Sequence, residues 1–183
     1  KIQWTDATQN YWYGCHKKTP GCAYCYMFRW AKRSGRDPQR VTRSSGTTFY
    51  APLKWKDPKI IFTCSLSDFF IKEADGWRDD AWSVIDRTRQ HTHLILTKEI
   101  NRVVEEPAKF IPWIRKGEVP WPHVRLSISA ENQHWLDKRL PELFKISAAG
   151  YFVSAEPLLS SLDFSRWLGL MSNKWGTRAK YRP

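Results

Sequence analysis

Long apolar runs are missing from this sequence, and so are several familiar catalytic motifs. No run approaches the ~18 consecutive apolar residues of a membrane span, and no basic-then-apolar leader opens the chain. A Walker loop, a GxGxxG turn, an HExxH pair and a Ser-His-Asp order are absent as well. The sequence therefore gives no sign of a membrane protein, a secreted protein, a P-loop NTPase, a zincin or a serine hydrolase. We expect a cytoplasmic protein without membrane association.

Acidic residues are scarce at both ends of the chain. Residues 1–50 contain nine Lys and Arg against two Asp and Glu, and residues 166–183 contain five Lys and Arg and no acidic residue. Residues 51–165 hold sixteen of each kind, so the formal net charge of +12 arises entirely from the two ends. Concentrated basic charge is typical of nucleic-acid-binding surfaces, and eleven Trp side chains offer stacking platforms for unpaired bases. We therefore expect a nucleic acid or a nucleotide as substrate or partner.

The length and composition suit a single folded domain. A chain of 183 residues with 42% hydrophobic and 15% aromatic residues can bury a sizeable core and is not disordered. We predict one domain over residues 1–183, divided into a basic, cysteine-bearing segment (1–50), a repeating part (51–165) and a basic tail (166–183). The first segment is predicted to be irregular apart from one helix over 22–33.

The repeating part alternates short β-rich runs with helical stretches. The β-rich runs recur about 30 residues apart, at 59–65, 92–98, 123–129 and 150–156. The helical stretches cover 76–90, 99–110 and 132–146, the last with Asn132 as its predicted N-cap. This spacing is typical of βαβ units, and the nearly continuous apolar strand text favours burial on both faces. We predict an α/β fold, either a partial (β/α) barrel or an open parallel sheet with flanking helices.

Polar side chains that can take part in catalysis or binding follow each predicted strand. In barrels and open α/β sheets the carboxyl ends of the strands form the active-site face, so these residues are expected to meet at one rim. Asp68 and Asn132 equally suit helix capping, whereas Lys98 and Glu156 do not cap and are the better functional candidates. The full set is Thr63, Cys64, Ser65, Ser67, Asp68, Thr97, Lys98, Ser127, Ser129, Glu131, Asn132, Ser154 and Glu156.

Three of the four cysteines, Cys15, Cys22 and Cys25, lie within eleven residues in a loop that Gly and Pro interrupt. In a reducing compartment such clustered thiols bind metal or do redox work. Structural zinc usually takes two closely spaced pairs and only one C-x2-C pair is present, but His16 or Cys64 as a fourth ligand keeps zinc open. Three cysteines alone suit an iron–sulfur cluster that leaves one iron free for a small molecule. Cys64 also suits a buried position at a strand end.

Ordered motifs run along residues 2–165 and together resemble a known family. They are Ile2-Gln3-Trp4-Thr5-Asp6-Ala7-Thr8, the loop from Gly14-Cys15 to Cys25-Tyr26, Ser67-Asp68-Phe69-Phe70, Leu96-Thr97-Lys98 and Phe152-Val153-Ser154-Ala155-Glu156-Pro157-Leu158-Leu159. The sequence resembles a phage-encoded family of unknown function with a three-cysteine motif, similar in appearance to radical S-adenosylmethionine (SAM) enzymes. The resemblance implies the cytoplasm of a phage-infected or prophage-carrying bacterium.

The resemblance also implies a cofactor set and a site. It implies a partial (β/α) barrel with an open-iron [4Fe-4S] cluster on Cys15, Cys22 and Cys25, and reductive cleavage of SAM to a radical that abstracts hydrogen from the substrate. Tyr24 stands where radical SAM loops carry the aromatic residue that lies near the adenine. Catalytic roles are expected for Lys98, as a carboxylate or phosphate partner, and for Glu131 and Glu156. The expected cofactor-binding residues are Tyr24, Ser65, Ser67, Asp68, Thr97 and Ser129, with Thr97 and Ser129 toward the substrate.

The sequence departs from the radical SAM pattern in two places. Six residues separate the first two cysteines, where the commonest motif has three. Relatives continue past the fourth strand into a Gly-Gly-Glu-Ser strand and a helix, whereas this chain ends in Arg166-Trp167-Leu168-Gly169 and a basic tail. We expect either a shortened member or a sequence that lacks a segment. In both cases the barrel is incomplete and has an open sheet edge for a protein partner or the N-terminal segment to cover.

Two rival functions remain open at this stage. A non-catalytic, zinc-binding nucleic-acid-binding protein keeps the basic ends and the cysteines but needs no rim of polar strand ends. A degenerate relative retained as an assembly subunit predicts a distorted cysteine loop and a large apolar patch at the sheet edge. The fourth metal ligand discriminates, because a protein group there indicates structural zinc and an open position indicates catalysis.

Overall fold

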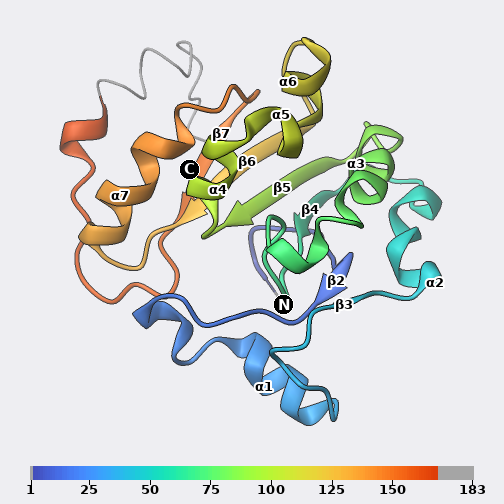
Figure 1. The fold of residues 1–183 in the computed structure, drawn as a ribbon, viewed down its shortest axis with the longest axis horizontal. Helices are drawn as coiled ribbons and strands as arrows, with labels where there is room; N and C mark the ends of the chain where they lie inside the picture. The colour runs from blue at the N-terminus through green and yellow to red at the C-terminus, as the bar shows by residue number, and fades with distance from the viewer. Residues whose placement is uncertain (1, 169–183) are drawn as a thin grey trace.

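The computed structural model describes residues 2–168 of the chain, so residues 169–183 of the predicted basic tail lie outside the described part. Five parallel strands form one sheet in the order β1-β4-β5-β6-β7 (Figure 1). They are β1 (Ala7–Gln9), β4 (Ile60–Thr63), β5 (Thr92–Thr97), β6 (Val124–Ser129) and β7 (Tyr151–Ser154). Within the described residues β1 and β7 remain the two edges, so the predicted open parallel sheet with flanking helices is confirmed.

The strand β1 was not predicted, because the basic segment 1–50 reads as irregular. Ala7, Thr8 and Gln9 pair in parallel with Ile61, Phe62 and Thr63 of β4. Of these three only Gln9 is buried, so the short strand carries no apolar alternation that a sequence pattern would reveal. Next to it, β2 (Trp12–Tyr13) and β3 (Thr42–Arg43) pair antiparallel. This pairing brings together the two ends of the stretch 14–41, which contains the three clustered cysteines.

The helices follow the predicted stretches with shifted ends. The predicted helix 22–33 begins only at Tyr26, because residues 20–22 form a 3-10 turn that contains Cys22. The stretch 99–110 is broken at Pro107, whose ring cannot continue a helix. Asn132 caps its helix as predicted by accepting from the backbone N–H of Trp135 at 3.1 Å. The helices are α1 (Tyr26–Arg33), α2 (Gly46–Phe49), α3 (Arg78–Asp86), α4 (Ile100–Glu105), α5 (Pro107–Phe110), α6 (Pro112–Lys116) and α7 (Gln133–Leu143), with 3-10 turns η1 (Pro20–Cys22), η2 (Ala51–Lys54) and η3 (Lys72–Ala74).

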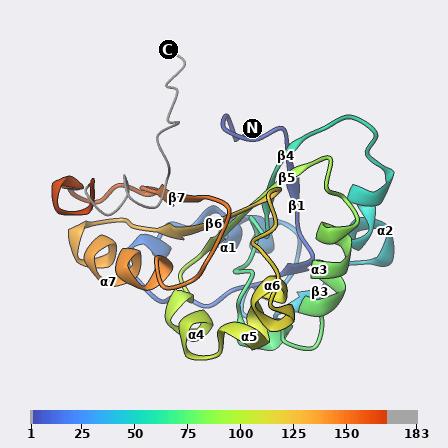
Figure 2. The same cartoon turned by 90° about the horizontal axis from the view of Figure 1, so that it is seen from above.

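Helices α3 to α7 lie on one side of the sheet, and within residues 2–168 no helix covers the other side (Figure 2). Strand β5 shows the consequence, because His93, Ile95 and Thr97 are buried while the residues between them are only half-buried. The expected burial on both faces holds for β6, where residues 126–129 are all buried, and for residues 61–63 of β4, but not for β5. No described helix is long and apolar enough to pass through a membrane.

Aromatic residues make up much of the core beneath the covered face. The rings of Trp82, Trp113 and Trp121 pack against one another with centroids 5.6–5.8 Å apart. Trp12 is fully buried, and its Nε1–H donates to the Asp68 carbonyl at 2.9 Å. These tryptophans are therefore packing residues and not platforms for bases, whereas Trp4 is 37% exposed.

A buried histidine in β5 predicts an acid-sensitive fold. His93 is fully buried, and burial together with the nearby His123 and His91 lowers its pKa to about 3. The unfolded chain takes up this proton near pH 6.5, so between pH 6.5 and about 3 the unfolded state binds more protons. We expect the free energy of unfolding to fall by up to about 1.4 kcal/mol for each pH unit in that range.

Urea titrations at a series of pH values measure this loss of stability. The His93→Gln variant keeps a group that can bond the Thr88 hydroxyl, which lies 3.0 Å from His93 Nε2. It should lose most of the slope between pH 6.5 and about 4. A variant with the same slope as the wild type would contradict the assignment.

Candidate functional site

A cavity of about 390 Å³ opens at the carboxyl ends of the strands, on the side of the sheet opposite α3 to α7. Eleven of the twelve residues for which the sequence predicted a catalytic, cofactor-binding or metal-binding role line it: Cys15, Cys22, Cys25, Tyr24, Ser65, Ser67, Asp68, Thr97, Lys98, Ser129 and Glu156. Glu131 is the exception, because its side chain is fully buried behind the wall. The structure thus brings the cysteine loop and the polar strand ends together at one site.

The cysteine loop is held against the segment that follows β4. Gly14 has φ +95°, and a Cβ at this position would lie 2.6 Å from the Arg40 carbonyl oxygen, so only glycine allows the two stretches to approach this closely. The Ser67 hydroxyl donates to the Gly14 carbonyl at 2.5 Å, and the Cys15 N–H donates to the Pro38 carbonyl at 2.9 Å. The loop therefore has a defined path before it reaches Cys22 and Cys25.

The four cysteines are free thiols and occupy different environments. Burial raises the pKa of the Cys15 thiol, and the Asp68 carboxylate and the other two loop thiols raise it further. Burial also opposes ionisation of Cys22, but hydrogen bonds from Lys18 and Thr19 and the charge of Lys98 outweigh it and hold the Cys22 pKa below its usual value. Cys22 therefore ionises more readily than Cys15, whose thiolate a positive group such as a metal would stabilise.

Asp68 joins the ends of β4 and β5. Its Oδ1 accepts from the Thr97 hydroxyl at 2.7 Å and from the Phe70 N–H at 2.9 Å, and its Oδ2 accepts from the Lys98 N–H at 2.8 Å. Burial raises its pKa, and the nearby Glu99 adds to this. These bonds use both carboxylate oxygens within the protein. The main role of Asp68 and Thr97 in the structure is therefore to hold the cavity wall in position.

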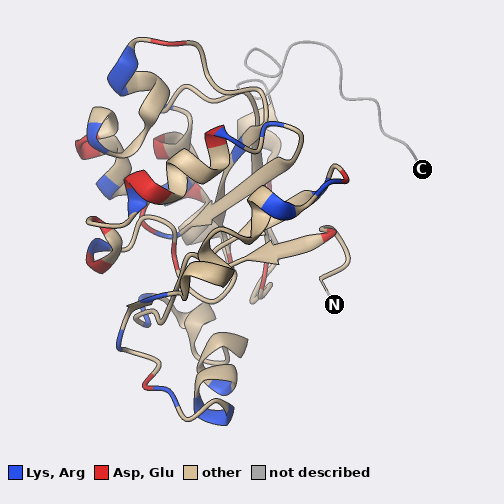
Figure 3. Cartoon of the chain, turned by 90° about the vertical axis from the view of Figure 1, so that its right-hand side faces the viewer, with Lys and Arg blue, Asp and Glu red and all other residues tan. Residues whose placement is uncertain are grey.

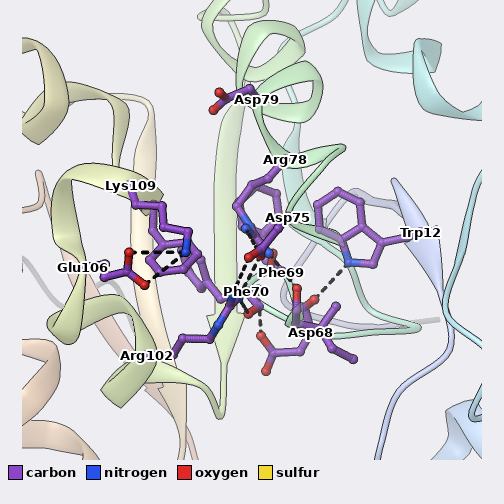
Figure 4. A network of polar contacts seen from close by, with 12 residues as sticks. Trp12, Asp68, Phe69, Phe70, Asp75, Arg78, Asp79, Arg102, Glu106 and Lys109 are labelled. Carbon is purple, nitrogen blue, oxygen red and sulfur yellow. Dashed lines mark hydrogen bonds and ion pairs between the residues drawn. The ribbon is translucent and has the colours of Figure 1, made fainter. Parts of the chain in front are cut away.

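The buried Arg78 and the half-buried Arg102 hold residues 67–74 in place (Figure 4). Arg78 donates to the Phe69 carbonyl at 2.9 Å and to the Ile71 carbonyl at 2.7 Å. Arg102 donates to the Phe70 carbonyl at 2.8 Å, and both arginines bond the Asp75 carboxylate. Neither the sequence pattern nor the motifs identified these residues. They fix the backbone that carries Ser67 and Asp68 into the site.

Lys98 points at the cysteine loop, where the sequence predicted a substrate-facing role. Its Nζ lies 3.0 Å from Thr19 Oγ1, 3.5 Å from Cys22 Sγ and 3.6 Å from Glu131 Oε1. Glu131 Oε2 in turn pairs with Arg139 Nη1 at 3.2 Å. A Cβ on Gly21 would lie 3.1 Å from the Glu131 side chain, so the loop packs directly on this carboxylate. Lys98 and Glu131 therefore position Cys22.

Of the remaining candidates, one bonds other parts of the protein and two are exposed at the rim of the cavity. Ser65 bonds Asn10 through its hydroxyl at 3.2 Å, and its carbonyl accepts from the Tyr26 hydroxyl at 2.5 Å. Tyr24 is 90% exposed at the mouth, and Glu156 is also exposed and has no polar partner among the described residues. Trp4, which sequence reasoning did not assign to the site, also lines the cavity and stacks near Phe62 with centroids 5.0 Å apart.

The two residues proposed as a fourth zinc ligand are otherwise engaged. His16 Nε2 lies 2.6 Å from the Glu73 carboxylate. Cys64 is 2% exposed in the core, where burial raises its pKa to about 12, and it does not line the cavity. Among the described residues no group of three or more His, Cys, Asp or Glu side chains is arranged around a point where a single metal ion would sit.

Comparison with known proteins places the chain in a family. No curated protein matches it, and no solved structure matches it. The family model described as "Protein of unknown function (DUF5131)" matches residues 1–175. This chain is therefore a member of the DUF5131 family.

Proposed function

We propose that the chain is a radical-SAM-like enzyme that binds a [4Fe-4S] cluster through Cys15, Cys22 and Cys25 and acts on a nucleic acid or a nucleotide. One observation carries the proposal: three free thiols line the same cavity as the polar ends of β4, β5, β6 and β7. A structural zinc site needs no such cavity. A catalytic cofactor needs one, because the protein must orient the substrate against it and exclude water.

The donor set fits a cluster better than a single ion. Thiolates around one zinc converge on one point at about 2.3 Å, whereas a cluster takes each thiolate on a different iron atom. Cys15, Cys22 and Cys25 come from a loop, a 3-10 turn and the residue before α1, and they face the cavity without a fourth thiol or free imidazole. When bound, such a cluster would supply an electron and one open iron for SAM.

The cavity also fits SAM. Its volume of about 390 Å³ lies within the range of small-molecule sites. Tyr24 and Trp4 offer aromatic surfaces at the mouth for the adenine. The exposed Glu156 carboxylate suits the amino group of the methionine, because it has no polar partner among the described residues, whereas Asp68 already accepts three hydrogen bonds from the protein. Ser129 and Ser154 lie on the open face of the sheet toward the substrate.

Metal analysis of anaerobically isolated and reconstituted protein tests the proposal. We expect a brown protein with about four iron atoms and four sulfides per chain, as the cluster formula requires. A colourless protein that holds one zinc and takes up no iron would contradict it and would support the zinc-binding alternative.

A further inference from the structure

We propose that the protein's substrate is a base within a single-stranded polynucleotide, whose phosphate backbone binds the basic lobe formed by residues 14–43. This inference rests on the proposed function for the chemistry at the cavity. The strand would be bound by cations and aromatic rings of the lobe and not by its cysteines, so binding can be tested without a cluster.

The lobe concentrates positive charge that the rest of the protein does not neutralise. Figure 3 shows Lys and Arg along α1 and the loop after it, with little acidic colour nearby. Of its cations, Lys18 pairs with Glu99 and Arg43 pairs with Asp80. Six others are exposed and have no carboxylate partner among residues 2–168: Lys17, Arg29, Lys32, Arg33, Arg36 and Arg40. Unpaired cations gathered on one surface are what a phosphate backbone recognises.

The cations also follow a path that starts at the cavity. Arg29 lines the cavity, and Lys32 and Arg33 follow one turn further along α1. Arg36 and Arg40 continue in the loop after the helix. The cavity has room for one small molecule or one nucleoside, whereas these cations extend along the surface outside the cavity. A free nucleotide would leave them unused, but a strand with one base in the cavity would place successive phosphates along them.

A second cavity in the lobe supplies a stacking surface. It measures about 250 Å³ and is lined by Tyr13, Trp30, Arg36 and Arg40 among others. The Tyr13 and Trp30 rings stack with centroids 5.2 Å apart, and the Arg36 guanidinium lies 5.2 and 5.7 Å from them. Aromatic rings and guanidinium planes side by side are the surfaces on which unpaired bases stack. This combination favours a single strand over a duplex, whose bases are already stacked.

Matched triple variants test the inference by fluorescence anisotropy with a labelled single-stranded oligonucleotide. The lobe variant carries Arg33→Gln, Arg36→Gln and Arg40→Gln. The control carries Lys54→Gln, Lys56→Gln and Arg87→Gln, which removes the same charge from exposed positions before β4 and β5, at the opposite end of the strands. A single strand contributes about 0.7 to the salt slope per phosphate contact. The lobe variant should therefore lose about 2 from the slope and about 100-fold in affinity at about 0.1 M salt, and the control little of either.

Four outcomes would overturn the inference. Three are equal losses in both triple variants, binding that does not depend on salt, and displacement of the strand by a mononucleotide at comparable concentration. The fourth is preference for anionic vesicles over the oligonucleotide, which would indicate a membrane surface. DNA and RNA probes of one sequence identify the kind of strand.

Iron content measured on the same samples separates the two proposals. Normal iron with unaffected strand binding in the lobe variant would refute the inference alone. If the protein held no iron but the lobe variant still lost strand binding, the proposed chemistry would be refuted and the binding surface would be supported.

Discussion

Replacing Cys22 with alanine is expected to reduce the iron retained after anaerobic reconstitution from about four atoms per chain to less than about one. Cys22 carries the thiol that the protein itself favours as a thiolate, because Lys98 Nζ lies 3.5 Å from its sulfur and Thr19 bonds it. Cys15→Ala and Cys25→Ala should cause the same loss, since a cluster held by three thiolates does not tolerate the removal of one. Iron and sulfide analysis with the visible spectrum measures the effect.

Cys64→Ala is the matched control for this series. Cys64 is a free thiol of the same chain, but it lies in the core away from the cavity. Its replacement should cost some stability through lost packing and leave the iron content unchanged. If Cys64→Ala removed iron while Cys22→Ala retained it, the ligand assignment would be wrong.

Replacing Arg139 with methionine is expected to destabilise the fold by about 3–5 kcal/mol. Arg139 is 3% exposed and pairs with Glu131, whose side chain is fully buried. Without Arg139 the carboxylate keeps only Lys98, whose Nζ is 3.6 Å away, as a charged neighbour. A buried charge that loses its partner retains its desolvation cost, and this explains the size of the effect. Equilibrium urea unfolding measures it.

Two further variants make this result specific. Arg115→Met removes an arginine from an exposed pair with Asp79 and should cost less than about 1 kcal/mol. The double variant Arg139→Met with Glu131→Leu removes both charges and should recover part of the lost stability. Equal effects of Arg139→Met and Arg115→Met would show that the buried pair does not stabilise the wall behind the cysteine loop.

Much of the fold follows from the sequence, because apolar runs mark strands wherever burial is continuous. The runs 92–98 and 123–129 match β5 and β6 within a residue at each end. The capping role of Asn132 could be predicted equally well, because its side chain bonds a backbone N–H only three residues further along the chain. The strand β1 was not, because a three-residue edge strand is defined by its pairing with β4, more than fifty residues away.

The membership of the site was predictable, but the roles of its residues were not. Polar residues after parallel strands meet at one rim by topology alone, which brought Asp68, Thr97 and Ser129 to the cavity. Their partners depend on side-chain packing from distant segments. Lys98 contacts Cys22 and Glu131 contacts Arg139, contacts that no spacing in the sequence encodes. Lys98 and Glu131, both predicted to be catalytic, therefore have contacts in the structure that the sequence did not indicate.

The electron paramagnetic resonance spectrum of the reduced, reconstituted protein, recorded with and without SAM, tests the central claim most directly. The claim is that three cysteines hold a cluster whose remaining iron faces a cavity that accepts SAM. We predict a signal of a reduced [4Fe-4S] cluster whose g-values shift when SAM is added, because SAM would bind the open iron. A protein that shows no such signal, or a signal that SAM leaves unchanged, would contradict the claim.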